Sequence, residues 1–279
     1  MLDTTFANAS QVRQSYPVAD VEVSVKAPAP VAAILSQTLS RTGVHQRHSN
    51  AATEITIERD HHDHWRIHGN NPGSERLVAV GKPAVEVAGA VVSTMIADAT
   101  SYSSMRLLRA TVISQNDRAL ALLGDDWDAT MLLASHLHAR AWNVVSGIYS
   151  FVDEGTLRVE PFHKLLFATS GSLWRLPLAY RRAVEASPWY VRDGGELGFY
   201  AVDPEVAYGR GSWCSSASLA AAVIIDGRGI QRDVQSAPTS ILDGLGKIAD
   251  RSDIRCGRLA FGDPHFSADA IERWFAQSA

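Results

Sequence analysis

Cysteine is scarce in this sequence: Cys214 and Cys256 are the two cysteines among 279 residues. They lie too far apart along the chain to form a local metal knuckle, and sparse cysteine fits a compartment where thiols stay reduced. The N-terminal residues also lack the basic and then apolar pattern of a secretory signal. These features predict a cytoplasmic protein with both thiols reduced.

Long apolar runs and a large excess of one charge are also missing. The longest apolar runs, at 88–92 and 220–225, are far shorter than the roughly 20 residues that a membrane span needs. The formal net charge of −4 provides no general attraction to nucleic acid or to an anionic membrane. Neither is expected as a partner. The content of 46% hydrophobic and 20% charged residues is typical of an ordinary globular protein.

The chain is expected to divide into three parts. Residues 1–18 hold few apolar anchors, which predicts a flexible N-terminal arm. Residues 19–105 combine alternating strand patterns with helical spacing, which predicts a small α/β lobe. Residues 106–279 are expected to form the core domain, which ends in an amphipathic helix at 267–276. Within it, residues 187–216 are rich in glycine, proline and aromatic residues and are predicted to form loops and short strands.

The core domain is organised around one strand, loop and helix. Residues 118–123 form an apolar run typical of a buried strand, and Gly124 begins a polar loop. Leucines at helical spacing then predict a helix over 131–140, and a second short strand is expected at 142–146. This order is typical of a nucleotide-binding α/β fold.

The loop departs from the pattern of a phosphate-binding loop. That pattern needs a glycine, four further residues, a second glycine, a lysine for the phosphates and a hydroxyl for magnesium. The chain has here Gly124, Asp125, Asp126, Trp127, Asp128, Ala129, Thr130 and Met131. The first glycine is kept, but the second glycine, the lysine and the hydroxyl are replaced. Like charges a few ångströms apart repel by about 1 kcal/mol in water, so the three aspartates predict a loop that repels ATP.

Several stretches of the core domain share one resemblance. Residues 107–110 (Leu-Leu-Arg-Ala) resemble a family strand of sequence LLHA, 118–124 the strand that enters the phosphate loop, and 136–140 the end of the following helix. Residues 221–226 and 253–262 resemble two late strands of the same family. On these stretches the chain resembles the HPr kinase and phosphoenolpyruvate-carboxykinase-like superfamily, specifically its HPr-kinase-related proteins. The resemblance covers roughly residues 75–279. It implies an α/β fold: an HPr-kinase-like P-loop core with a mixed sheet flanked by helices, preceded by a small α/β lobe.

The departures from the family bear on activity. Active members of the family use the loop lysine and an acidic residue after the second strand, where this chain has Thr130 and Ser146. The histidine of the LLHA strand is Arg109. A phosphoryl transferase contributes little beyond positioning and electrostatic stabilisation, so the joint loss of these groups removes most of its means of catalysis.

Two hypotheses of function follow. The first is a pseudokinase: a catalytically degenerate HPr-kinase-like protein that needs no cofactor and binds a peptide or protein partner in a biosynthetic or regulatory pathway. That partner is a biosynthetic enzyme or a second copy of the chain. The alternative is a kinase with a rebuilt site, which uses ATP and Mg²⁺ to phosphorylate a peptide or a small hydroxylated substrate. The resemblance places Ser146, His163 and Lys164 at a possible substrate edge.

Two clusters have the composition of metal sites. His62, His64 and His68 fall on alternate residues around a predicted hairpin tip, so their rings can share a face; the other interpretation is a solvated polar tip. The loop aspartates are suited to a hard cation, or else to capping the helix that follows. Capping and a solvated tip are the interpretations that we favour, and no metal is expected.

Overall fold

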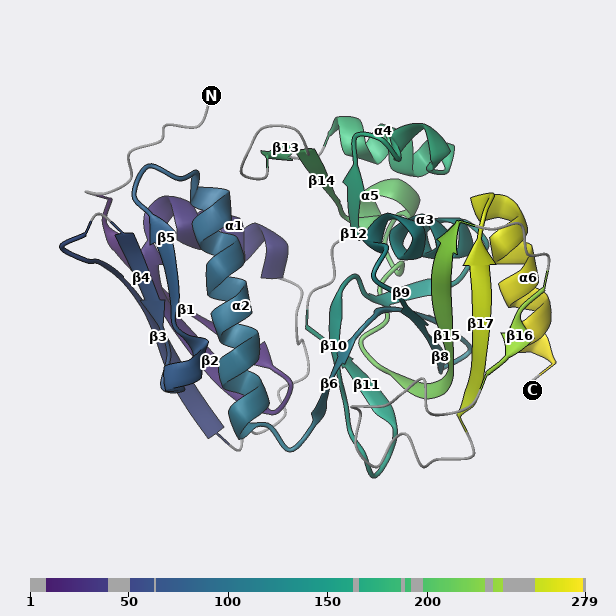
Figure 1. Ribbon diagram of the computed structural model, residues 1–279, viewed down its shortest axis with the longest axis horizontal. Coiled ribbons are helices and arrows are strands. Elements are labelled where there is room, and N and C mark those ends of the chain that lie inside the picture. The colour runs from purple at the N-terminus through teal and green to yellow at the C-terminus, as the bar shows by residue number, and fades with distance from the viewer. Residues whose placement is uncertain are drawn as a thin grey trace. The chain divides into compact units, whose positions relative to one another are not determined.

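A computed structural model gives the structure of the protein, and it describes residues 9–39, 51–62, 64–162, 166–186, 189–191, 198–228, 233–237 and 254–277 (Figure 1). The chain forms two compact units. Unit 1 consists of Met1–Met105 with Val191–Gly194, and unit 2 of Arg106–Tyr190 with Gly195–Ala279. Each contains a mixed sheet with flanking helices, which confirms the predicted α/β class.

The sheet of unit 1 follows the chain, in the spatial order β1-β2-β3-β4-β5. Its elements are β1 (Gln11–Val18), β2 (Val21–Pro28), α1 (Ala29–Leu39), β3 (Ala51–Arg59), β4 (His64–His68), η1 (Pro72–Ser74), β5 (Arg76–Ala79) and α2 (Ala84–Tyr102). Strands β2 and β3 run parallel, and the other neighbours are antiparallel. The crossover from β2 to β3 includes α1, as a parallel connection requires.

The core of unit 1 lies between one face of this sheet and its helices. In β2 the alternate valines Val21, Val23 and Val25 are buried. Helix α2 is long and apolar enough to meet the length and composition test for a membrane span, and 44% of that window is buried. Its buried residues include Val87, Val91 and Met95, so core packing accounts for much of its apolar character.

The expectation of a flexible arm over residues 1–18 is wrong from Gln11 onward. Residues 11–18 form β1, which pairs with β2 along its whole length. Tyr16 and Val18 supply the apolar anchors because both side chains are buried. Ala19 adopts a positive φ in the tight turn between the two strands. Residues 1–8 lie outside the described part of the chain.

Unit 2 is built on a larger sheet with the order β6-β10-β11-β15-β8-β7-β9, in which β17 pairs with β15 and β16 (Figure 1). These strands are β6 (Arg106–Arg109), β7 (Thr111–Gln115), β8 (Arg118–Leu123), β9 (Asn143–Ser146), β10 (Tyr149–Val152), β11 (Arg158–Pro161), β15 (Ala217–Arg228), β16 (Gln235–Ser236) and β17 (Arg255–Phe261). A small sheet has the order β12-β14-β13, from Leu166–Thr169, Gly198–Val202 and Trp189–Val191. The helical elements are α3 (Trp127–His138), η2 (Leu173–Arg175), α4 (Leu178–Glu185), α5 (Pro204–Tyr208) and α6 (Pro264–Ala276).

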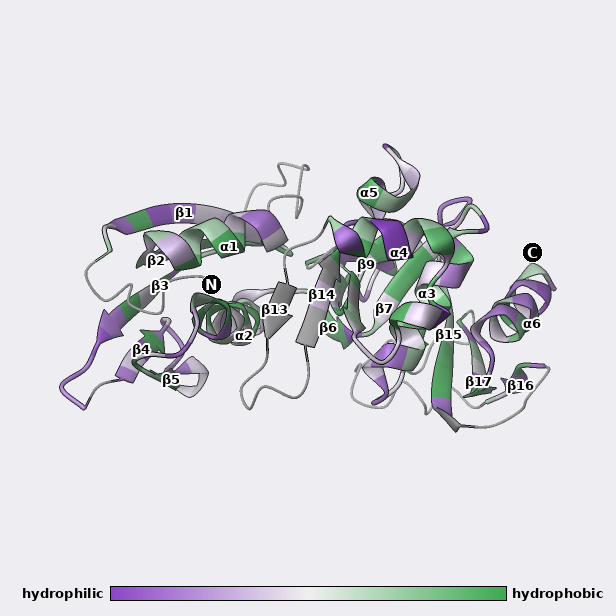
Figure 2. Cartoon of the chain, turned by 90° about the horizontal axis from the view of Figure 1, so that it is seen from above, coloured by the Kyte–Doolittle hydropathy of each residue, from purple (hydrophilic) through white to green (hydrophobic). Residues whose placement is uncertain are grey.

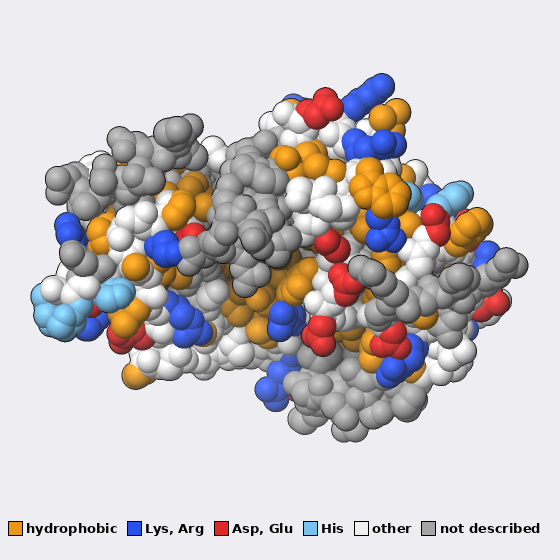
Figure 3. Space-filling view, turned by 45° about the horizontal axis from the view of Figure 1, so that its top comes forward, with side chains coloured by type: hydrophobic (Ala, Val, Ile, Leu, Met, Phe, Trp, Pro, Cys, Tyr) orange, Lys and Arg blue, Asp and Glu red, His pale blue; other side chains and the backbone are white. Residues whose placement is uncertain are grey.

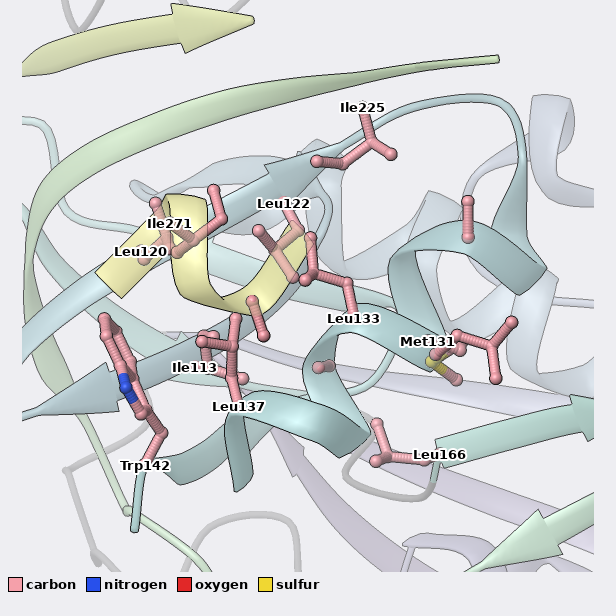
Figure 4. Close-up of a cluster of buried hydrophobic side chains, with 14 of the residues drawn as sticks. Ile113, Leu120, Leu122, Met131, Leu133, Leu137, Trp142, Leu166, Ile225 and Ile271 are labelled. Carbon is pink, nitrogen blue, oxygen red and sulfur yellow. The ribbon is translucent and has the colours of Figure 1, made fainter. Parts of the chain in front are cut away.

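Two apolar clusters fill unit 2. One joins α3, α4 and α6 to the central strands and includes Leu120, Leu133, Trp142 and Ile271 (Figure 4). The other is made almost entirely of strand residues on the opposite side of the sheet, such as Val112 and Val159. Because β15 lies between the parallel strands β8 and β17 and is buried along much of its length, it is hydrophobic (Figure 2).

The expected C-terminal helix begins earlier than predicted. Asp263 caps α6 by accepting hydrogen bonds from the backbone N–H groups of His265 and Phe266. Pro264 occupies the first helical position, where its missing N–H costs nothing. Ser267, the first residue of the predicted helix, lies instead within its first turns and is buried.

Candidate functional site

The loop after β8 is shorter than predicted. Helix α3 begins at Trp127, three residues after Gly124, whereas the sequence predicted a loop as far as Thr130. The reason is local: Asp126 adopts an extended backbone and caps the helix, and no second glycine interrupts the residues that follow. The positions where a phosphate loop would still be curving therefore already belong to a helix.

The protein's own carboxylate occupies the N-terminus of α3. The side chain of Asp126 accepts a hydrogen bond from the backbone N–H of Ala129 at 3.1 Å. A helix N-terminus favours negative charge because its first N–H groups lack helical partners. Here Asp126 supplies that charge, and the capping role expected for the loop aspartates is confirmed for this residue.

Asp128 binds a neighbouring turn. One carboxylate oxygen accepts a hydrogen bond from the hydroxyl of Thr169 at 2.6 Å, and the other accepts from the hydroxyl of Ser172 at 3.4 Å. Thr169 ends β12, and Ser172 immediately precedes η2. Asp128 therefore connects α3 to the segment that leads into α4. Asp125 is exposed, and within the described residues it makes no such bond.

The three positions that would carry glycine, lysine and hydroxyl in a phosphate loop are buried. Ala129 and Thr130 are each 2% exposed, and Met131 is 3% exposed. The hydroxyl of Thr130 donates to the backbone carbonyl of Trp127 at 3.0 Å. Met131 packs in the main core cluster, and Figure 4 shows it facing Leu166. These side chains therefore stabilise the helix and the core.

Gly124 serves a close contact between strands. A Cβ atom at this position would lie 2.8 Å from the backbone carbonyl oxygen of Ile225, closer than two such atoms can approach. Strand β15 runs parallel to β8 here, with Ile224 opposite Leu123. Glycine is required at this position by the approach of β15, whether or not an anion binds.

Trp127 lies between two side chains from the β6–β10 edge of the sheet. The guanidinium of Arg109 lies 5.0 Å from the centre of the Trp127 ring, within the range of a cation–π contact. The ring of Tyr149 meets it edge-on at 6.5 Å. Arg109 and Tyr149 are directly paired across β6 and β10. Trp127 is thus half-buried by its neighbours, although it belongs to a stretch that the sequence predicts to be a polar loop.

Of the three residues predicted at a possible substrate edge, the structure describes Ser146. Ser146 is completely buried in β9, and its hydroxyl donates to the backbone carbonyl of Tyr149. A buried and bonded hydroxyl is unsuited to meet a substrate. His163 and Lys164 lie outside the described residues.

The histidines of the β3–β4 hairpin in unit 1 do not converge. His64 and His68 lie on the same face of β4, but Arg66 stands between them. Four residues along a strand span about 13 Å, whereas zinc holds its nitrogen ligands at about 2 Å. His62 lies in the turn, where its backbone N–H donates to Asp60. Among the described residues, no group of three His, Cys, Asp or Glu side chains is placed to hold a metal ion.

A buried histidine and two tyrosines form a cluster that the sequence did not predict. His138 is buried, and its Nδ1 lies 2.6 Å from the hydroxyl oxygen of Tyr180. Its ring packs edge-on against Tyr208, 4.9 Å away. Burial lowers the pKa of His138 to about 4, and burial also raises the pKa of Tyr180. The cluster joins α3 to α4 and α5, and no short-range signal marks it because the three residues are far apart in sequence.

Comparison with known proteins finds only distant structural similarity. No protein-family model matches the chain, and no curated protein matches it. Among solved structures, the structure of the HPr(Ser) kinase/phosphatase from Coxiella burnetii is similar over 62% of this chain and 92% of that protein, with a TM-score of 0.35 and 8% sequence identity. This is a distant structural similarity, and the function has to be argued from the residues of this chain.

Proposed function

We propose that the protein is a pseudokinase: an HPr-kinase-like scaffold that has lost its nucleotide site and acts by binding a peptide or protein partner. The observation that carries this proposal is the state of the loop after β8. Asp126 occupies the start of α3, and Ala129, Thr130 and Met131 are buried in it. A polyphosphate would meet carboxylates where a kinase presents free N–H groups and a lysine.

Electrostatics supports the same conclusion. Two charges 4 Å apart interact by about 4 kcal/mol at the effective dielectric constant of a protein surface. Asp125, Asp126 and Asp128 bring three negative charges to the loop, and the nearby cation Arg109 is engaged with Trp127. Because phosphoryl transfer depends on compensating phosphate charge, this loop is a poor place for the reaction. No cofactor is needed for the proposed role.

A thermal-shift assay with Mg²⁺-ATP and Mg²⁺-ADP tests the loss of nucleotide binding. A ligand present at 100 times its Kd stabilises the folded state by about 2.7 kcal/mol and thereby raises Tm. Because we expect no nucleotide to bind, we expect no rise in Tm at millimolar nucleotide. A Tm that is higher with Mg²⁺-nucleotide than in a control with Mg²⁺ alone would defeat the proposal.

Transfer of labelled γ-phosphate to a mixture of hydroxyl-bearing peptides tests the alternative kinase. We expect no transfer above a blank without protein. Transfer that disappears in an Asp126→Ala variant and persists in the matched Asp125→Ala variant would favour a kinase with a rebuilt site. The two carboxylates are a matched pair because both are exposed, whereas Asp126 also caps α3.

A further inference from the structure

Large apolar side chains are exposed on the segment that includes η2, α4 and α5. Trp174 is 73% exposed, Leu178 55%, Val206 58% and Tyr208 41%. Helix α4 packs against α5, and η2 leads into α4 through Leu176 and Pro177. We call these four residues, with the three arginines described next, the α4–α5 surface. Exposed tryptophan and tyrosine side chains are enriched at the centres of protein interfaces.

Among the described residues, three arginines on the α4–α5 surface have no acidic partner. Arg181 and Arg182 are exposed on α4, and Arg210 follows α5. None of the three forms a salt bridge within the described residues, although Glu185 lies one turn from Arg181. Several other arginines of unit 2 form salt bridges: Arg106 with Glu154, Arg158 with Asp117, and Arg258 with Asp226. Figure 3 shows basic and hydrophobic side chains side by side over this part of the molecule.

The α4–α5 surface is held in place by α3. The Nε2 atom of His136 lies 2.8 Å from the carbonyl oxygen of Arg175 in η2. The hydroxyl of Tyr180 in α4 is hydrogen-bonded to His138, and Tyr208 of α5 packs on the same imidazole. Asp128, one of the loop aspartates, holds the turn before η2. A surface ordered in advance loses less entropy when a partner binds, so the anchoring suits recognition.

We infer that the α4–α5 surface binds an acidic segment of another protein that carries large apolar side chains. This inference rests on the proposed function and names the partner by its chemistry. Arginine pairs with carboxylates in a bidentate geometry, and the exposed Trp174 and Leu178 offer the apolar contact. The partner is thus an amphipathic peptide with aspartate or glutamate on the side that faces Arg181 and Arg182.

Charge disfavours two other occupants of this surface. In a symmetric dimer both copies would contribute the same patch, so the interface would gather arginines that have no acidic partner within the described part of the chain. An anionic membrane would attract the arginines locally, but the whole chain carries a net charge of −4 and is repelled by such a surface. A short acidic peptide meets only the local positive charge.

Selection from a random peptide library displayed on phage tests the partner chemistry with the full-length protein. We expect the selected peptides to be enriched in Asp or Glu together with Leu, Phe or Trp, and to bind more weakly as NaCl rises from 50 to 500 mM. Selected peptides without acidic enrichment would overturn the inference. So would binding of the protein to phosphatidylserine vesicles in place of peptides, or a concentration-dependent dimer that Trp174→Ala abolishes.

Matched variants then locate the binding site by fluorescence anisotropy with the tightest selected peptide. Trp174→Ala and Arg181→Glu should each weaken binding at least about fivefold. Phe266→Ala and Arg76→Glu, which alter an exposed aromatic residue and an exposed arginine outside the surface, should leave it within about twofold. Because Trp174 is largely exposed, its loss should leave the circular dichroism spectrum and Tm unchanged.

The two proposals fail in different ways. If the Trp174 and Arg181 variants bind the peptide as the wild type does, the α4–α5 surface is wrong and the pseudokinase proposal stands. If the wild type is stabilised by Mg²⁺-ATP, the pseudokinase proposal fails whatever the peptide result.

Discussion

Restoring the residues of a phosphate loop should damage this protein without giving it a nucleotide site. The informative variant combines Ala129→Gly, Thr130→Lys and Met131→Ser, which rebuilds the second glycine, the lysine and the hydroxyl. In a protein that had lost only the key side chains, these changes would recover binding. Here all three positions lie in the first turns of α3 and are buried, so the new side chains would enter the core.

The expected cost can be built from its parts. Truncating a buried methionine to alanine costs about 2–5 kcal/mol, and Met131→Ser also buries a hydroxyl. A glycine in a helix costs about 1 kcal/mol relative to alanine. The lysine at position 130 would have to bury an ammonium group, at several kcal/mol, or disrupt the first turn. The sum of at least about 5 kcal/mol is comparable with the whole stability of many domains.

Urea denaturation followed by circular dichroism measures this loss. Met131→Ser alone should lower the free energy of unfolding by about 2–5 kcal/mol, whereas the matched Met131→Leu variant, which conserves volume, should lose less than about 1.5 kcal/mol. A triple variant with the urea midpoint of the wild type, and with measurable binding of Mg²⁺-ATP, would refute the reasoning.

Further predictions concern the start of α3 and the buried histidine. Asp126→Ala should lose about 0.5–2 kcal/mol of stability with the cap, while Asp125→Ala should be nearly neutral; equal losses in urea denaturation would contradict the capping role. Gly124→Ala should cost about 1–3 kcal/mol through overpacking, with or without nucleotide, and an unchanged urea midpoint would remove the argument from the β15 contact. The pKa of His138 falls from 6.5 to about 4 on folding, so the folded state resists protonation: its stability is fully present above pH 6.5 and decreases by roughly 3 kcal/mol as pH falls to 4. His138→Gln should flatten Tm against pH in that range, and a slope like that of the wild type would show that another group is responsible.

The strands were predictable because their signals are local. Residues 118–123 form a strand as predicted, and the turn at Asn116 and Asp117 joins it to β7, with both residues at positive φ. The alternation in β2 was equally clear. The apolar run over residues 107–114 predicts one continuous strand, but it forms two strands because the chain leaves β6 at Ala110 to enter β7. Apolar periodicity does not reveal such a break. Ile241, Leu242, Leu245 and Ile248 have helical spacing, which predicts a helix over residues 238–249, and this segment lies outside the described residues.

The candidate site was harder to predict because it depends on helix ends and on contacts between residues that are far apart in sequence. The sequence showed which phosphate-loop groups are replaced, but the helix start at Trp127 depends on a cap, and helix ends are weakly encoded. The engagement of Asp128 with Thr169 joins residues 41 positions apart. Likewise, the exposure of Trp174 on the α4–α5 surface has no signature in residues 172–186, which the sequence predicts to be largely helical with an interruption near Pro177.

Isothermal titration calorimetry of the wild-type protein with Mg²⁺-ATP measures directly whether the nucleotide site has been lost. We expect no heat of binding beyond dilution at nucleotide concentrations up to the millimolar range. A saturable isotherm with a micromolar Kd, and contacts of the phosphates with the N–H groups after Gly124 in a structure of the complex, would contradict it.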